Sequence, residues 1–289
     1  MVNVSRETSM KSTHKTIEVQ DHLVSGEIFP IRFDSSGNLG RTIVRDDLNL
    51  SDYYPDDDYV SHQEQPKGFK GVLYTAAQKI MLKLKLKVLR SDSMQNKVLD
   101  IGGGIGVFAS FLKSHGFDVS LTEPNLKARQ SAAKKGIKSY ANIDDVPLKE
   151  TYSILTLWHV LEHVSELDFT LQKYSKLLKT NGLLIVAVPN VASFDAVYYG
   201  PYWAAYDVPR HLWHFKPKGL VRKLENHGFG LLKTYPLWFD SFYISFLSET
   251  YAKRNFPFLR GLVIGLYSNL KALITKEYSS KIFVFQKLT

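Results

Sequence analysis

The sequence Lys97-Val-Leu-Asp-Ile-Gly-Gly-Gly-Ile-Gly-Val-Phe-Ala-Ser110 joins two apolar runs through four glycines that lie within five positions. The first run predicts a short buried strand, and the second predicts a helix. Glycine adopts positive φ at little cost and has no Cβ to keep a ligand away from the backbone. The first N–H groups of the following helix have no partner within the helix and are available to a ligand. The stretch therefore predicts a strand–turn–helix unit that binds a nucleotide-like ligand.

The glycines fit two patterns. Gly104-Ile-Gly106-Val-Phe-Ala109 fits the G-x-G-x-x-G/A turn of dinucleotide-binding sheets, which would indicate an NAD(P)-dependent oxidoreductase. Asp100-x-Gly102-x-Gly104-x-Gly106 fits the acidic-x-G-x-G-x-G loop of class I S-adenosylmethionine-dependent methyltransferases. Asp100 favours the second pattern, because a carboxylate beside the loop repels a pyrophosphate and attracts the amino group of S-adenosylmethionine.

Strands and helices alternate regularly after this loop. Strands are predicted at 117–122, 137–141, 152–158 and 183–188, and helices at 107–115, 125–135 and 161–179. This alternation predicts an α/β fold with a doubly wound, mostly parallel sheet. A helix at 218–227 and strands at 230–235 and 281–287 complete seven strands. The last two strands lack a simple crossover, which predicts an antiparallel last strand.

The rest of the chain surrounds this sheet. Residues 1–20 are polar and are predicted to be a disordered tail, and residues 21–92 form a small cap and a helix at 69–90. The main domain covers residues 93–289 and carries insertions at 190–216 and 237–280. The second insertion is aromatic and basic, and it predicts two helices broken near residues 255–257. We expect it to act as a lid over an acceptor, with peripheral membrane contact or homodimer formation as further roles.

Composition excludes several classes of protein. The 289 residues include no cysteine, so disulfides and thiolate metal sites are excluded. No apolar run approaches the ~20 residues that span a bilayer, and no signal peptide is evident, so a cytoplasmic protein is expected. The net charge of +9 comes mostly from scattered residues, so we do not expect a nucleic-acid partner. Asp56, Asp57 and Asp58 are adjacent and cannot all face one ion, which predicts a solvated turn.

Polar residues follow the second and third strands of the predicted sheet. Glu123 lies 123 − 104 = 19 residues after Gly104 and is followed by Pro124, the position at which a carboxylate binds ribose hydroxyls. Asn142 and Ile143 follow the third strand, where they either bind an adenine or form an ordinary polar loop. We expect these residues to contribute to the cofactor site.

His159 follows the fourth strand, at the edge of the sheet where ligands bind in open α/β folds. It is expected to face the cofactor or the acceptor and is a candidate base. With Glu162 and His163 it forms H-x-x-E-H, which is similar to an inverted zinc signature. Zinc is not predicted, because the motif straddles a strand–helix turn and lacks a third ligand. His163 is expected to pack or cap the turn, or to take part in catalysis.

A dense group of aromatic and ionisable residues occupies the first insertion, from Trp203 to Phe215. Arg210 is a candidate clamp for an acidic acceptor, with Tyr206 and Asp207 beside it. His211 and His214 are candidate general bases. The alternative is an Asp207–Arg210 ion pair that fixes the loop.

The chain resembles the class I S-adenosylmethionine-dependent methyltransferases, and in particular a bacterial branch among polysaccharide, lipid and quinone methylation enzymes. The matching pieces are VLDIGGGIGVFASFL, LTEPN, ILTLWHVLEHV, GLLIVAVPN and YDVPRHLWHFKPKGL, within residues 97–235. The resemblance implies a Rossmann-like fold and methylation of oxygen on a small molecule, glycan or lipid-linked intermediate. It places Asp100 and the glycines at the methionine part of the cofactor, Glu123 at the ribose, and Asn142 and Ile143 near the adenine.

Many members of this branch carry a cysteine-rich zinc ribbon at the N-terminus. The present chain has no cysteine, so its cap is at most a metal-free relic of that ribbon. A non-catalytic module that binds S-adenosylmethionine is a further alternative to an enzyme.

Overall fold

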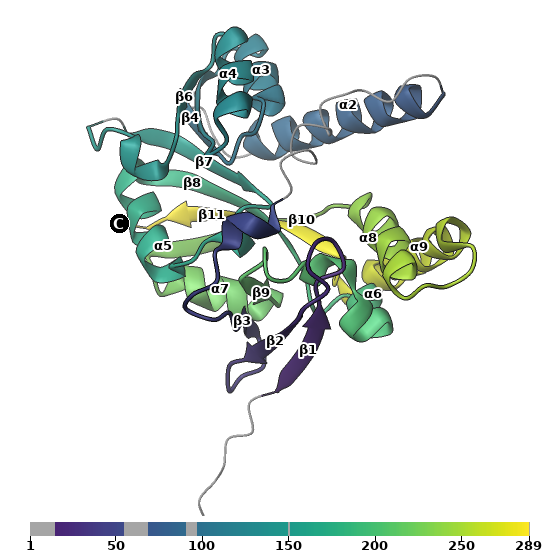
Figure 1. Cartoon of the computed structure of the whole chain (residues 1–289). Helices are drawn as coiled ribbons and strands as arrows, with labels where there is room; N and C mark the ends of the chain where they lie inside the picture. Colours follow the sequence, from purple (N-terminus) through teal and green to yellow (C-terminus); the bar gives the residue numbers. More distant parts are fainter. Residues whose placement is uncertain (1–14, 55–68, 91–96, 150, 289) are drawn as a thin grey trace, which may run out of the picture.

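The computed structural model describes residues 15–54, 69–90, 97–149 and 151–288 (Figure 1). The expected turn at Asp56–Asp58 and the first 14 residues of the expected tail lie outside the described residues. A seven-stranded sheet has the order β10-β11-β8-β7-β4-β5-β6. Its strands are β4 (Lys97–Ile101), β5 (Asp118–Thr122), β6 (Lys138–Tyr140), β7 (Tyr152–Trp158), β8 (Leu178–Pro189), β10 (Phe229–Pro236) and β11 (Ser280–Lys287).

The pairing of these strands confirms the predicted sheet. Strands β4 to β8 pair in parallel, whereas β11 is antiparallel to both β8 and β10. The central strands are buried on both faces, as expected of a parallel sheet covered by helices.

Alternate residues of each strand pack into two separate cores. Val98 and Ile154 face the core beneath α2 (Phe69–Arg90), α3 (Val107–Ser114) and α4 (Leu126–Lys134). Leu99 and Leu155 face the core beneath α5 (Leu167–Leu177) and α7 (Pro217–Glu225). The period of two along the strands thus produces the doubly wound architecture.

A second sheet joins the N-terminal cap to the first insertion. It has the antiparallel order β1-β2-β3-β9, with β1 (Thr16–Gln20), β2 (Ile28–Phe33), β3 (Leu39–Thr42) and β9 (Trp213–Phe215). The prediction of a disordered tail is wrong for residues 16–20, because Val19 is buried and pairs with Phe29. The polar residues Thr16, Glu18 and Gln20 lie on the exposed face of β1, and they made the segment as polar as the tail that precedes it.

The second insertion forms the expected pair of helices, α8 (Asp240–Tyr251) and α9 (Pro257–Thr275). Lys253 and Phe256 adopt positive φ in the turn between them. The pair lies beyond one end of β10 and beside α6 (Phe194–Tyr199) in Figure 1. The position of the predicted break, residues 255–257, is confirmed.

The predicted helix at 161–179 is shorter in the structure. Leu161–His163 forms one 3-10 turn (η3), α5 begins only at Leu167, and β8 begins at Leu178. The chain is extended at Val164, whose carbonyl oxygen accepts a hydrogen bond of 2.8 Å from Trp213 Nε1. A contact from the first insertion therefore interrupts the helix that local sequence favours.

Candidate functional site

The glycine loop adopts a backbone that requires glycine. Gly102, Gly104 and Gly106 have φ of +66°, +55° and +74°. A Cβ on Gly102 would lie 2.6 Å from the Val160 side chain, and one on Gly106 would lie 2.9 Å from Ala132. A Cβ on Gly104 would meet no atom within 4 Å. Gly102 and Gly106 thus allow close packing, while Gly104 presents bare backbone to open space, as a ligand cradle requires.

Asp100 lies at the end of β4 beneath this loop and is 2% exposed. Burial raises the pKa of its carboxyl to about 6, although the hydrogen bond from Thr156 and the nearby charge of Lys85 act in the opposite direction. Thr156 Oγ1 donates to Asp100 Oδ1 at 2.6 Å. The carboxylate is therefore fixed in orientation and placed for a cationic group.

Lys85 is a candidate site residue that sequence reasoning missed. Its ammonium lies 4.2 Å from the Trp158 ring centroid, and burial lowers its pKa to about 8 against the charges of Asp100 and Asp240. The signal in the sequence was a lysine between two apolar residues, Leu84 and Leu86, of the predicted helix. Such a lysine must find a partner, because an unpaired buried ammonium is costly.

Glu123 follows β5 and is 1% exposed. Its Oε2 accepts a hydrogen bond of 3.0 Å from Gly104 N, and its Oε1 accepts one of 2.9 Å from Asn125 N. Pro124 lies between these contacts, and its carbonyl oxygen accepts from Arg129 at 2.6 Å. Glu123 therefore links the glycine loop to the start of α4 at the carboxyl edge of the sheet.

Asn142 and Ile143 follow β6 at the same edge. Asn142 donates its backbone N–H to Asp145 Oδ2 at 2.9 Å, which closes a 3-10 turn, η2 (Ile143–Asp145). Asn142 is exposed, and Ile143 packs partly against the core. Since β6, β5, β4 and β7 are neighbours, these residues share the sheet edge with Glu123 and the glycine loop.

His159 follows β7 with a φ of +56°, an uncommon backbone conformation for histidine. Its Nδ1 lies 3.3 Å from Glu162 Oε1, and its Nε2 lies 3.1 Å from Asp240 Oδ2. Burial acts to lower the pKa of His159, but hydrogen bonds and charge from Asp240 and Glu162 raise it to about 10. The ring is therefore an imidazolium at neutral pH. Asp240, which sequence reasoning also missed, begins α8, 81 positions away in the chain.

Glu162, His163 and His211 form a compact group beside His159. Each residue offers one possible metal-ligand atom, and these three atoms lie within 4.8 Å of one another. His211 is thus a third candidate ligand beside Glu162 and His163, which the sequence did not indicate, whereas His159 of the motif is outside this set. The absence of a metal stays a prediction. Glu162 Oε2 has no hydrogen-bond partner among the described residues, but the carboxylate has a counter-charge in His159.

The two histidines of this group are oriented by backbone carbonyls. His163 Nδ1 lies 3.0 Å from Arg210 O, and His211 Nδ1 lies 2.9 Å from Ala205 O. Burial and the neighbouring His211 lower the pKa of His163 to about 4, so His163 is neutral. Because a carbonyl only accepts, His211 donates Nδ1–H to Ala205 O, and in the tautomer with this one proton its Nε2 carries a lone pair.

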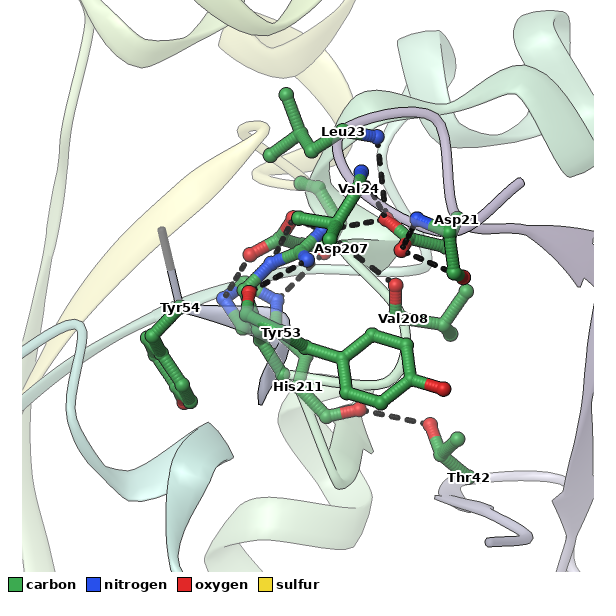
Figure 2. A network of polar contacts seen from close by, with 12 residues as sticks. Asp21, Leu23, Val24, Thr42, Tyr53, Tyr54, Asp207, Val208 and His211 are labelled. Carbon is green, nitrogen blue, oxygen red and sulfur yellow. Dashed lines mark hydrogen bonds and ion pairs between the residues drawn. The ribbon is translucent and has the colours of Figure 1, made fainter. Parts of the chain in front are cut away.

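Arg210 lies in a buried network that joins the cap to the first insertion. Its guanidinium donates to Asp207 Oδ1 at 2.7 and 3.0 Å, to Asp21 Oδ1 at 3.0 Å and to Tyr53 O at 3.0 Å. Figure 2 shows the side chains of Asp21 and Asp207 at this point, where Tyr53 contributes its backbone carbonyl. The arginine is only 5% exposed. The structure therefore favours the ion-pair interpretation of Asp207 and Arg210 over an acceptor clamp.

His214 and Tyr206 are buried away from open space. His214 Nε2 lies 2.8 Å from Thr42 Oγ1, and burial lowers the pKa of His214 to about 3. Tyr206 is 4% exposed and packs edge-on against His214, and burial raises its pKa to about 12. These two residues pack between β9 and the cap, and neither lines the pocket described next.

A pocket of about 480 Å³ brings the remaining candidates together. His159, Asp207, His211 and Asp240 supply its polar wall, and its apolar wall includes Leu23, Tyr243, Ile244 and Leu247. The pocket thus draws on the β1–β2 turn, the end of β7, the first insertion and α8. A second cavity of about 510 Å³ lies between the β1–β2 turn and the end of α8, and none of the catalytic candidates lines it.

The sheet with its antiparallel β11 and the acidic-x-G-x-G-x-G loop after β4 define a class I S-adenosylmethionine-dependent methyltransferase. The chain belongs to the methyltransferase-domain family, whose model matches residues 74–234, more than half of the chain. S-adenosylmethionine is therefore the cofactor, and the interpretation as an NAD(P)-dependent oxidoreductase is wrong.

Curated relatives support this assignment. A ubiquinone biosynthesis O-methyltransferase of Rhodopseudomonas palustris is 28% identical over 48% of this chain and 59% of its own length. Another, of Pelagibacter ubique, is 30% identical over 36% of this chain and 47% of its own. The chain thus spans less than two thirds of the length of these relatives.

Solved structures share the fold. Magnesium protoporphyrin IX methyltransferase from Synechocystis PCC 6803 with bound S-adenosylhomocysteine has a TM-score of 0.55 at 13% identity, over 82% of this chain and 98% of that one. A possible histamine N-methyltransferase from Thermotoga maritima has a TM-score of 0.50 at 17% identity, over 71% and 89%. None of the described helices is long and apolar enough to cross a membrane.

Proposed function

We propose that the protein transfers the methyl group of S-adenosylmethionine to a hydroxyl oxygen of an acceptor bound in the 480 Å³ pocket. The observation that carries the proposal is the position of His211 and His159 on one wall of that pocket, at the edge of the sheet that holds the cofactor loop. Bound S-adenosylmethionine supplies an activated methyl group, so the protein has to bind, align and deprotonate the acceptor.

The cofactor residues have separate roles in this proposal. Asp100 attracts the amino group of the methionine part, and Lys85 binds its carboxylate. Gly104 allows the cofactor to approach the backbone. Glu123 accepts hydrogen bonds from the ribose, with Pro124 fixing the turn. The sheet-edge position of Asn142 and Ile143 supports a contact with the adenine.

His211 is the proposed general base. Its Nδ1–H is donated to Ala205 O, so Nε2 is the atom that can accept the hydroxyl proton. Asp207 Oδ2 lies 3.8 Å from that Nε2 and would stabilise the imidazolium that forms. His159 is already protonated and cannot accept a proton, so we assign it to fixing Asp240 and the pocket wall rather than to base catalysis.

The walls of the pocket indicate the chemistry of the acceptor. Leu23, Ile244 and Leu247 are apolar, and Tyr243 adds an aromatic ring. Such walls suit an apolar body, while the histidine suits a hydroxyl acidic enough to lose its proton near neutral pH. We therefore favour a phenolic or lipid-linked acceptor over a free sugar. The relatives named for ubiquinone biosynthesis support the same choice.

The second insertion has a role in this site, because α8 supplies Asp240, Tyr243, Ile244, Leu247 and Tyr251 to the pocket. We propose that it acts as a lid that walls the acceptor. Replacing residues 240–278 by a short linker should remove methyl transfer. Loss of S-adenosylmethionine binding to the same degree would show instead that the insertion is part of the core.

The test is an acceptor panel of substituted phenols, catechols and prenylated phenols, together with free sugars and RNA. We expect S-adenosylhomocysteine to form with apolar phenols, and the product to carry a new O-methyl group by NMR. Methylation of nitrogen or carbon, or turnover with RNA alone, would contradict the proposal.

A further inference from the structure

Helix α9 exposes an unusually apolar surface. Its large apolar side chains that lie in solvent are Phe258, Leu259, Leu262, Val263, Leu266, Tyr267, Leu270, Leu273 and Ile274, and Ile274 is 86% exposed. At 3.6 residues per turn these nine positions fall within about half of the helix circumference. They form one continuous face, which we call the α9 face. A contiguous apolar surface of this kind marks an interaction site.

The opposite side of α9 is made of small and polar residues. Gly261, Gly265, Ser268, Asn269 and Ala272 are the buried ones. A Cβ on Gly261 would lie 2.6 Å from Phe246 Cα, and one on Gly265 would lie 2.9 Å from Phe242 Cα. The partner helix α8 likewise has small buried residues at this contact, because backbone atoms of Ser245 and Ser241 lie next to Gly261 and Gly265. The two backbones therefore approach closely through small side chains.

This arrangement reverses the usual distribution of residues in a water-soluble helix pair. In water, large apolar side chains drive helices together and small polar ones face outward. In lipid, helices pack through small residues and direct large apolar ones at the acyl chains. The α8–α9 pair follows the second pattern, so its outer face matches a lipid environment.

Charge favours lipid headgroups over a second copy of the chain. Residues 254–276 contain Arg254, Arg260, Lys271 and Lys276 but no Asp or Glu. Arg254 and Arg260 are paired with the buried Glu249, which leaves the two lysines at the far end of α9. The carboxylate of the next residue, Glu277, already accepts a hydrogen bond from Asn190 Nδ2 at 2.8 Å and lies 4.0 Å from Lys281 Nζ. A two-fold contact between α9 faces would therefore bring lysines of the two copies together.

We propose that the α9 face docks the protein on an anionic lipid bilayer, with α9 lying in the plane of the headgroups. Amphipathic helices bind such interfaces through an apolar face flanked by lysine and arginine. Because α9 packs on α8, and α8 lines the acceptor pocket, docking brings that pocket close to the membrane surface. The proposal does not depend on which atom of the acceptor is methylated.

The test is flotation of the full chain with vesicles of phosphatidylcholine alone or mixed with phosphatidylglycerol. We expect the protein to float with the anionic vesicles and to float less with the neutral ones. Leu262→Gln/Leu266→Gln/Leu270→Gln should weaken binding by about tenfold or more, because three apolar side chains lose their contact with the acyl boundary. All three are already solvent-exposed, so the fold should remain intact by circular dichroism.

Matched controls separate this face from general apolarity and charge. Leu126→Gln/Leu148→Gln changes two exposed leucines elsewhere and should leave flotation unchanged. Lys271→Gln/Lys276→Gln should weaken binding to anionic vesicles by about fivefold per lysine, an effect that added salt removes. Failure of the wild type to float, or equal flotation of the triple-leucine variant, would overturn the proposal. A wild-type dimer by light scattering that the same variant dissociates, without flotation, would overturn it in favour of self-association.

Discussion

Asp240 Oδ2 lies 3.1 Å from His159 Nε2, so the first turn of α8 is joined to the end of β7. The second insertion thereby contributes a charge to the edge of the sheet that holds the cofactor loop. The contact raises the pKa of His159, which links the protonation of this histidine to the position of α8.

Asp240→Asn should change the pH dependence of stability. The pKa of His159 is about 10 in the folded protein, against an ordinary value of 6.5. The contribution of protonated His159 to the free energy of unfolding is therefore complete below pH 6.5 and is lost as the pH rises through about 10. We expect the wild type to lose more free energy of unfolding than the variant over this interval, measured by urea denaturation at a series of pH values. Asp47→Asn at an exposed position should behave as the wild type.

Arg210→Met should destabilise the fold rather than weaken acceptor binding alone. The substitution leaves Asp21 and Asp207 without their counter-charge, and Asp21 is 1% exposed. Breaking a buried ion pair from one side costs about 3–5 kcal/mol. Urea denaturation should show this loss, and Arg45→Met, at an exposed arginine, should not. Normal stability with a raised KM for the acceptor would restore the clamp interpretation.

Asp100→Asn should weaken S-adenosylmethionine binding by about 10- to 100-fold, because a charged hydrogen-bond acceptor is lost. In the wild type, affinity should fall as the pH is lowered through about 6, where the buried carboxyl takes up a proton. Calorimetry measures both effects, and NAD should not bind to either protein. A flat affinity across this pH interval would argue against contact between Asp100 and the cofactor.

Gly102→Ala and Gly104→Ala should separate packing from ligand approach. Both positions have positive φ, which costs an L-residue about 1–2 kcal/mol. Gly102→Ala adds a clash with Val160 and should lower the free energy of unfolding further. Gly104→Ala meets no protein atom, so its main effect should be on S-adenosylmethionine affinity. If both variants lost the same stability and Gly104→Ala bound S-adenosylmethionine as the wild type does, a contact between the cofactor and the Gly104 backbone would be contradicted.

Local sequence patterns were sufficient to predict the central fold. Alternation of apolar runs placed the strands and helices, and the loop from Asp100 to Gly106 located the cofactor edge. Element ends were less certain where tertiary contacts decide them, as at Val164, whose carbonyl accepts from Trp213. Strand β1 was missed although polar and apolar residues alternate from Thr16 to Gln20, because an alternation of only five residues is a short signal next to a polar segment.

The candidate site was only partly predictable, because its geometry comes from residues far apart in the chain. Arg210 binds Asp21, 189 positions away, and no local pattern indicates that pair. The same holds for His159 and Asp240. The histidines themselves were identified from their type and position, but only the fold separates the pocket residue His211 from the buried His214.

The kinetics of His211→Ala test the central claim most directly, with the phenolic acceptor that gives the highest turnover. We expect kcat/KM to fall by about 10²- to 10⁴-fold, since a positioned base contributes that much, while S-adenosylmethionine affinity stays within about twofold. His115→Ala, at an exposed histidine that caps the C-terminal end of α3, should retain wild-type rates. Full turnover by His211→Ala would contradict the account.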